Sequence, residues 1–210
     1  MEVIYSNSIP ELFKDKFTLG IYGDKLDLIN NNIEFNGIEY NDNWSVKRFL
    51  NGLKYKINSN ILDLFDELNI SVNLLNKKIK ELSNSEFKFV LLCYVIINKK
   101  ELVYLDYFDK GLSYKNKKKL VYFLKRKYDG NLVVISNDLI FLNNLCKHLI
   151  VFKESNIVFN DKIEYIYKSK VKIDYPEIIK FIRLANKNKT KLSYTVETRE
   201  LLKDIYRSVR

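Results

Sequence analysis

The chain of 210 residues has the length of one α/β domain, or of one domain with a small appendage. Apolar residues make up 47% of it, which is enough for a substantial core. The net charge is +10, but the Lys residues are spread through the chain with Asp and Glu between them. We therefore expect a solvated basic surface and no nucleic-acid partner.

The composition also argues against a membrane-spanning segment and a metal or disulfide framework. The longest uncharged apolar run, residues 89–98, has about ten residues, whereas a spanning helix needs about 20. The first residues lack the charged-then-apolar pattern of a signal peptide. We expect a cytoplasmic protein held at the inner face of the membrane only by a partner. Cys93 and Cys146 lie in apolar segments, which predicts buried thiols and no metal site.

Helices are predicted in the first half of the chain. Apolar residues recur at helical spacing over residues 61–68 and 72–82, and a third helix is expected over residues 86–98. This third segment is apolar nearly all round, so we expect it to be buried. Together these helices predict a small helical subdomain over about residues 50–98.

Three short apolar runs predict strands, over residues 102–105, 132–135 and 149–152. They are nearly all apolar rather than alternating, as is typical of strands covered on both faces. Helices are predicted between them, over residues 116–128 and 138–147. The βαβαβ order indicates a parallel sheet with right-handed crossovers.

After the third strand, a hairpin turn is predicted to lead into a strand over residues 157–159. The tail carries two amphipathic segments, one beginning near Pro176 and one centred near Leu201. We therefore predict an α/β fold of three layers with a mostly parallel sheet over residues 1–160. A C-terminal helical extension is expected over residues 161–210.

Polar residues stand at three places in this framework. The first is the stretch Leu82, Ser83, Asn84, Ser85 and Glu86, just before a predicted helix. Asp106 follows 23 residues after Ser83 at the end of a predicted strand, and Ser136 follows 30 residues after Asp106 at the end of the next. We expect Asp106 and Ser136 to end adjacent parallel strands.

The order and spacing of these stretches over residues 61–158 resemble the signature, Walker B strand and switch loop of ABC ATPases. LSNSE stands where that family usually has LSGGE or LSGGQ, and the tail is similar to the ends of energy-coupling-factor ATPases. The resemblance implies a P-loop NTPase fold of the ABC type. It also implies hydrolysis of MgATP and a role as the nucleotide-binding subunit of a membrane transporter.

The phosphate-binding part of that family is degenerate in this chain. A P-loop needs GxxxxGK[ST], because backbone N–H groups and the Lys hold the phosphates while Ser or Thr holds Mg²⁺. Counted from Gly23, residues 28–30 are Leu, Ile and Asn, and the nearby Lys25 follows an Asp. The helix that should follow is also predicted to be missing, because strand-like residues 33–37 come directly afterwards. Gly23, Lys25 and Asp106 are therefore interpreted as remnants of a nucleotide site.

The catalytic residues implied by the resemblance are replaced as well. Tyr107 stands where the family has the catalytic Glu, and a phenol with a pKa near 10 is not a base at neutral pH. Asn137 replaces the switch His, Ser113 replaces the Asp that ends the family's D-loop, and the chain contains no Gln for a Q-loop. We expect no hydrolysis at this chain's own site and no bound ATP or Mg²⁺.

Three of these residues keep two interpretations. Asp106 either binds Mg²⁺ or caps the turn that follows its strand. Ser83 either contacts a nucleotide held by a partner chain or caps a helix. His148 precedes a predicted buried strand and lies away from the switch position, which favours a packing or surface role.

The sequence thus predicts a degenerate energy-coupling-factor subunit, a pseudo-ATPase that forms the structural or regulatory half of a membrane transporter. Its expected partner is an integral membrane transporter subunit, an intact ABC ATPase subunit or both, and the isolated chain is expected to be a monomer. The alternatives are an interaction module on an ABC fold unrelated to transport, a still-active transport ATPase, and a nucleic-acid-associated ABC protein. The last would need a basic groove with interleaved aromatic residues, and none is concentrated in the sequence.

Overall fold

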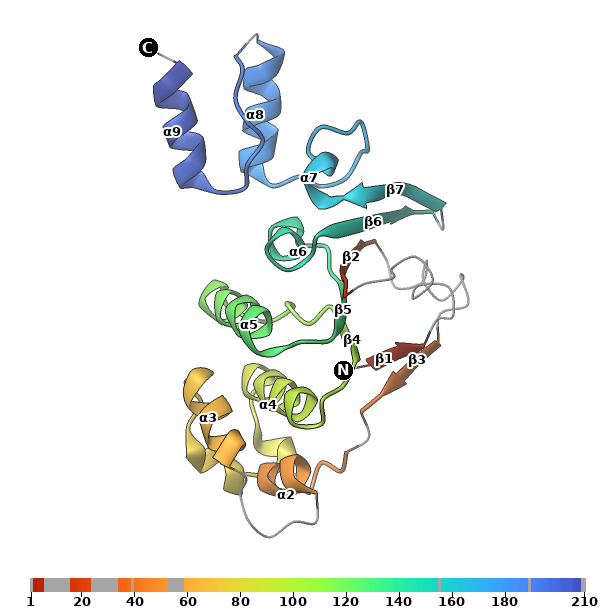
Figure 1. The fold of residues 1–210 in the computed structure, drawn as a ribbon, viewed down its shortest axis with the longest axis vertical. Helices are drawn as coiled ribbons and strands as arrows, with labels where there is room; N and C mark the ends of the chain where they lie inside the picture. The colour runs from red at the N-terminus through yellow and green to blue at the C-terminus, as the bar shows by residue number, and fades with distance from the viewer. Residues whose placement is uncertain are drawn as a thin grey trace.

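A computed structural model describes most of the chain as an elongated molecule built around one sheet (Figure 1). The described residues are 2–5, 16–23, 34–38, 40–52, 59–154, 156–188 and 190–208. The strands are β1 (Glu2–Tyr5), β2 (Thr18–Tyr22), β3 (Glu34–Gly37), β4 (Leu102–Asp106), β5 (Asn131–Ile135), β6 (His148–Lys153) and β7 (Asn156–Lys162). The α-helices are α2 (Val46–Asn51), α3 (Ser59–Glu67), α4 (Asn84–Ile97), α5 (Tyr114–Lys127), α6 (Leu139–Leu145), α7 (Ile163–Ile166), α8 (Glu177–Lys187) and α9 (Thr198–Ser208). Two short 3₁₀ helices are η2 (Val72–Asn76) and η3 (Ile79–Glu81).

The main sheet has five strands in the order β4-β5-β2-β6-β7. The first four are parallel, and β7 pairs with β6 in an antiparallel hairpin, so the predicted βαβαβ unit and hairpin are confirmed. Asp106 at the end of β4 lies in register with Ile135 at the end of β5. Asp106 and Ser136 therefore close adjacent parallel strands, as predicted. A separate two-stranded ribbon pairs β1 with β3.

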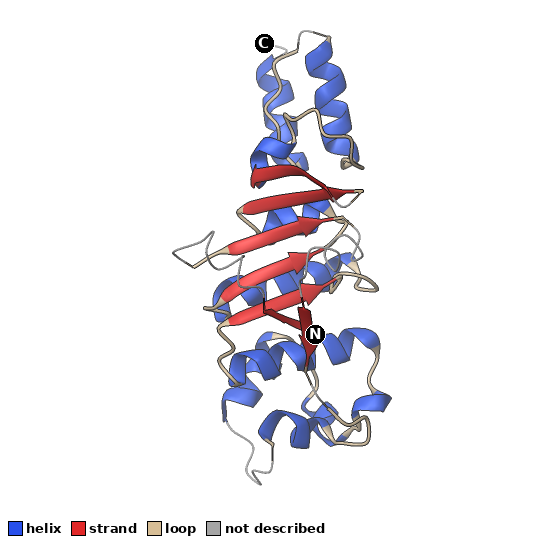
Figure 2. Cartoon of the chain, turned by 90° about the vertical axis from the view of Figure 1, so that its right-hand side faces the viewer, coloured by secondary structure: helices blue, strands red, loops and turns tan. Residues whose placement is uncertain are grey.

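Helices α4, α5 and α6 lie along one face of the sheet (Figure 1), and Figure 2 shows them behind the strands. Gly20 lets α6 approach β2 closely, because a Cβ at this position would lie 3.3 Å from atoms of Cys146, Leu142 and Leu149. The face of α5 toward the core carries Leu120, with no exposed surface, and its buried neighbours on the same stripe. The α/β fold class with a mostly parallel sheet is thus observed.

The opposite face of the sheet is buried as well. Leu19, Ile21, Tyr104, Val133 and Ile135 are at most 1% exposed and form a second apolar cluster. The β1–β3 ribbon lies on this side, with β1 in contact with β4 (Figure 1). These residues are covered within the chain alone, so no partner is required to shield them from water.

The predicted helix over residues 72–82 is wrong. The chain forms η2 and η3 there instead, separated by Lys77 and Lys78 in extended conformation. The carbonyl of Lys77 accepts a hydrogen bond from the N–H of Val46 (2.9 Å), and Ser45 forms a β-bridge with Lys78. Backbone groups that a continuous helix would need are therefore used by a segment more than 30 residues earlier, around the unpredicted α2.

Other predicted helices are observed with small shifts at their ends, as α3, α4, α5, α6, α8 and α9. Ile179 and Ile182 of α8 have no exposed surface and Leu201 of α9 is 8% exposed, so both tail helices pack on the chain's main core. The domain limits at residues 160 and 161 stay predictions. Within the described ranges, no helix is long and apolar enough to cross a bilayer.

Two predictions concern residues that are not described. Lys25 and residues 28–30, where the sequence places the degenerate P-loop, lie outside the described residues. The predicted absence of the following helix falls on the same undescribed segment, residues 24–33. Both stay predictions.

We expect Leu92→Ala to lower the free energy of unfolding by about 2–5 kcal/mol, because Leu92 on α4 has no exposed surface and its truncation leaves a cavity. Urea unfolding followed by circular dichroism measures the change. Leu62→Ala on α3 is the control, since Leu62 is 40% exposed and should lose less than about 1 kcal/mol. Equal losses of stability for the two variants would contradict the burial of Leu92 on α4.

Candidate functional site

The carboxyl ends of β2, β4 and β5 bring together the residues that the sequence singled out. Gly23 follows β2, Asp106 ends β4, and Ser136 and Asn137 follow β5. These strands are neighbours in the sheet, and ligands of open α/β folds bind outside the carboxyl ends of the strands. This edge is therefore the candidate site.

Gly23 is held through both of its backbone groups. The hydroxyl of Tyr107 donates a hydrogen bond to the Gly23 carbonyl oxygen. The side-chain oxygen of Asn137 accepts one from the Gly23 N–H, at 3.3 Å. Tyr107 and Asn137 stand at the positions implied for the catalytic Glu and the switch His, so these replacements bind the chain's own backbone.

Gly23 also lies tightly against β6. Its φ is +142°, and a Cβ there would come within 2.9 Å of the carbonyl oxygen of Phe152. A larger residue would have to displace backbone, so the position requires glycine. The close approach fixes the end of β2 where a phosphate-binding loop would begin.

Tyr107 has an unusual backbone conformation for a bulky residue, with φ at +43°. Conformations of this kind cost about 1–3 kcal/mol and persist only where the surroundings hold them. Its N–H donates to the carbonyl of Ile135 at 2.9 Å, and the Lys110 ammonium lies 3.8 Å from the ring centroid. The hydrogen bond to Gly23 adds a third contact that holds the ring toward β2.

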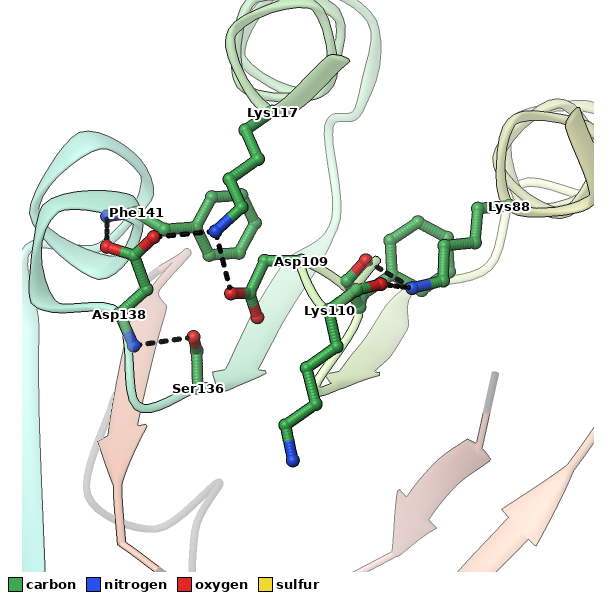
Figure 3. Close-up of polar contacts among 8 residues, drawn as sticks. Lys88, Asp109, Lys110, Lys117, Ser136, Asp138 and Phe141 are labelled. Carbon is green, nitrogen blue, oxygen red and sulfur yellow. Dashed lines mark hydrogen bonds and ion pairs between the residues drawn. The ribbon is translucent and has the colours of Figure 1, made fainter. Parts of the chain in front are cut away.

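The turn after β4 is bound to the start of α4. Lys88 donates hydrogen bonds to the carbonyls of Phe108 (2.8 Å) and Lys110 (2.5 Å), as Figure 3 shows. Partial burial lowers the pKa of Lys88. Gly111 has φ at +73°, and a Cβ there would lie 2.7 Å from the side-chain nitrogen of Asn84. The signature remnant and the turn after Tyr107 are thus in direct contact.

Lys117 of α5 connects the turn after β4 with the loop after β5 (Figure 3). Its ammonium lies 2.7 Å from a carboxylate oxygen of Asp138 and 3.3 Å from one of Asp109, which is 5% exposed. Partial burial opposes its charge, but the bonds to Asp138 and Asp109 outweigh it and raise the pKa of Lys117. Asp138 also caps α6 by accepting from the N–H of Phe141 at 3.0 Å, and Ser136 accepts from the N–H of Asp138 at 3.0 Å.

The signature remnant begins α4 with a capping box. The Ser83 hydroxyl accepts from the N–H of Glu86 (3.3 Å), and the Glu86 carboxylate accepts from the N–H of Ser83 (2.7 Å). The bond from the Ser83 backbone, then that from its hydroxyl, lowers the pKa of Glu86. Leu82 and Ser85 are half-buried and Asn84 is exposed. The helix-cap interpretation of Ser83 is thus the observed geometry.

The remaining candidates have ordinary structural positions. Asp106 is half-buried, with one carboxylate oxygen shielded from solvent. Ser113 caps α5 by accepting from the N–H of Asn116 at 3.3 Å. His148 begins β6, and its Nε2 lies 2.6 Å from the side-chain oxygen of Asn160 across the hairpin.

A shallow pocket of about 330 Å³ lies beside Gly23 and Asn137. Lys153 and Lys172 line it together with Glu154, so its charges partly cancel. Sequence reasoning missed Lys88, Lys117 and Lys172, because nothing in their sequence neighbourhoods distinguishes them from the chain's many other lysines. What distinguishes Lys88 and Lys117 is contact with groups 20 or more residues away.

No family model matches the chain. It is 27% identical over 150 residues to the zinc import ATP-binding protein ZnuC of Wigglesworthia glossinidia brevipalpis. The matched region covers 69% of this chain and 60% of that protein. The chain therefore spans less than two thirds of the length of this curated relative.

The fold is similar to that of a solved structure described as an inward-facing conformation of a metal-chelate type ABC transporter. The TM-score is 0.54 at 14% sequence identity, with 71% of this chain and 73% of the other covered. This similarity concerns the fold, and the relative above supplies the similarity in sequence. In its sequence the chain is thus similar to an ABC ATP-binding protein, and in its fold to an ABC transporter.

Proposed function

We propose that this chain is an ABC-type subunit that has lost ATP hydrolysis and serves as the structural or regulatory half of a membrane transporter. The observation that carries the proposal is the binding of Gly23 by Tyr107 and Asn137. In a working P-loop, backbone N–H groups face the phosphates. Here the first of them is engaged by a side chain of the same molecule.

The side-chain chemistry at the carboxyl ends of these strands also supports the loss of hydrolysis. Hydrolysis needs a group that takes a proton from the attacking water, and a phenol with a pKa near 10 does not do so at neutral pH. Tyr107 occupies the position of that base and uses its hydroxyl to donate to Gly23. Breaking the two hydrogen bonds of Gly23 would cost about 0.5–1.5 kcal/mol each, which further disfavours nucleotide binding. The proposed role needs neither ATP nor Mg²⁺.

The proposed partners follow from the relatives. One is named as a zinc import ATP-binding protein and the other as a metal-chelate type ABC transporter. We propose that this chain binds an integral membrane transporter subunit, pairs with an intact ABC ATPase subunit, or does both, on the inner face of the membrane. The similarity of its tail to the ends of energy-coupling-factor ATPases supports a role in that class. Pairing with an intact subunit would let one active site remain in the dimer.

The isolated chain should release no phosphate from ATP, because both the base and the phosphate nest are replaced. A steady-state phosphate-release assay with excess MgATP measures this, with Asp106→Asn as the matched control. The two proteins should give the same background rate. Turnover that Asp106→Asn abolishes, or a stable nucleotide-dependent homodimer in light scattering, would instead support a still-active transport ATPase.

Tyr107→Phe should lower the free energy of unfolding by about 0.5–1.5 kcal/mol, because it removes the hydroxyl that donates to Gly23. Urea denaturation measures the change without nucleotide. The control is Tyr206→Phe, since Tyr206 is 73% exposed and should change stability by less than about 0.5 kcal/mol. An unchanged stability for Tyr107→Phe would show that the hydroxyl does not hold Gly23.

Ser83→Ala should lower the free energy of unfolding by about 1 kcal/mol at neutral pH, with or without MgATP, because Ser83 caps α4. A loss of stability in Ser83→Ala that appears only with MgATP would favour the nucleotide-contact interpretation.

The lowered pKa of Glu86 means that its stabilising contribution is present above about pH 4.5 and is lost as the pH falls through the folded-state pKa. Glu86→Gln should therefore flatten the acid limb of a plot of stability against pH. Glu164→Gln, on the exposed side of α7, is the control.

A further inference from the structure

A groove of about 690 Å³ runs between α5 and α6 and is closed by residues 196–198, at the start of α9. A second hollow of about 430 Å³ continues it toward the amino ends of the strands, and the two share Lys125 and Asn144. Helix α5 has 14 residues, so the combined groove follows about 21 Å of helix. Its length suits an extended chain better than a compact small molecule.

The groove is positively charged. Its lining includes Lys117, Lys118 and Lys125 of α5, with Lys16 and Lys147 at the far end, and α5 carries no Asp or Glu. Of the carboxylates that line the groove, Asp138 is bound by Lys117, and Glu197 lies close enough to Lys118 for their charges to interact. In the part of the chain that the structure describes, no salt bridge joins Lys125 or Lys147 to a carboxylate. Lys125, which lines both hollows, and Lys147, at the far end of the groove, therefore have no carboxylate partner.

Aromatic and aliphatic groups lie among these charges. Tyr114, Lys118, Tyr122 and Arg126 follow each other at intervals of four residues and form one stripe along α5. Tyr114 and Tyr122 are 69% and 60% exposed. Helical periodicity thus gathers aromatic and cationic residues that the linear sequence separates.

The apolar floor favours a peptide over a nucleic acid. Ile140, 37% exposed, and Val121 line the groove between the cations, and aliphatic surface has no partner in a sugar-phosphate backbone. One face of each tyrosine ring is also occupied. The Lys118 ammonium lies 4.6 Å from the Tyr114 ring centroid, and the Arg126 guanidinium lies 5.1 Å from that of Tyr122. Bases that bind single strands by stacking would have to displace these cations.

We infer that this groove binds an acidic segment of a partner protein, in which Asp or Glu side chains alternate with apolar ones. At about 3.3 Å per residue, an extended segment of about six residues spans the groove. Its carboxylates would meet Lys118 and Lys125, and its apolar side chains would lie on Val121 and Ile140. The inference does not depend on whether the chain hydrolyses ATP.

Fluorescence anisotropy with three labelled probes tests the inference on the full chain. The first is a 12-residue peptide alternating Glu with Leu, the second has Gln in place of Glu, and the third is a 12-nucleotide oligothymidine. Only the Glu peptide should bind measurably at about 0.1 M salt, and its affinity should fall at about 1 M salt, where the Debye length shortens from about 10 Å to about 3 Å.

The double variant Lys118→Glu and Lys125→Glu should weaken binding of the Glu peptide at least about tenfold. Its matched control reverses two exposed lysines after α7, Lys168→Glu and Lys170→Glu, which do not line the groove and should leave binding unchanged. If circular dichroism shows that the first double variant does not fold, Lys125→Gln gives the same readout with a smaller change.

Three results would overturn the inference. Binding of neither peptide would show that the groove does not take an acidic segment. Equal weakening by the two double variants would assign binding to overall charge rather than to this groove. Tight binding of the oligothymidine without binding of the Glu peptide would assign the groove to single-stranded nucleic acid.

Discussion

The two hydrogen bonds on Gly23 tie together the ends of three neighbouring strands. Tyr107 reaches from β4 and Asn137 from β5, and both bind the backbone at the end of β2. Each bond contributes modestly on its own, but together they occupy both the N–H and the carbonyl oxygen of Gly23. The strained backbone of Tyr107 is held by the same contact. Stability at this edge therefore comes from side chains at the two positions where the resemblance implies a catalytic Glu and a switch His.

Two lysines, Lys88 and Lys117, also hold the loops of this edge in place. Lys88 joins α4 to the turn after β4, and Lys117 joins that turn to the loop after β5. Removing one partner of a shielded ion pair leaves the other charge uncompensated, so these loops are coupled in stability. The signature remnant takes part through Asn84, whose side chain contacts the turn at Gly111.

Helix α5 divides its surface among different tasks. Its buried stripe, represented by Leu120, packs on the sheet, and Lys117 faces the loops at the candidate site. Tyr114, Lys118 and Tyr122 of its outward stripe line the groove beside α6. Because one rigid helix carries both polar surfaces, a segment bound in the groove would lie next to the loops that Lys117 holds. Partner binding and the order of the candidate site would then share one structural element.

The sequence by itself determined the strands β4, β5 and β6, the helices between them and the placement of Asp106 and Ser136, because these follow from local apolar periodicity and chain order. It also predicts that Tyr107 and Asn137 replace the catalytic residues of the family, and this stays a prediction. Only the tertiary structure decided what those side chains bind, since Tyr107 and Gly23 are 84 residues apart. Residues 72–82 were mispredicted for the same reason, because their backbone pairs with Trp44 to Val46 instead of continuing a helix. Contacts between distant segments leave no periodic trace in a single sequence, and the candidate site is made of such contacts.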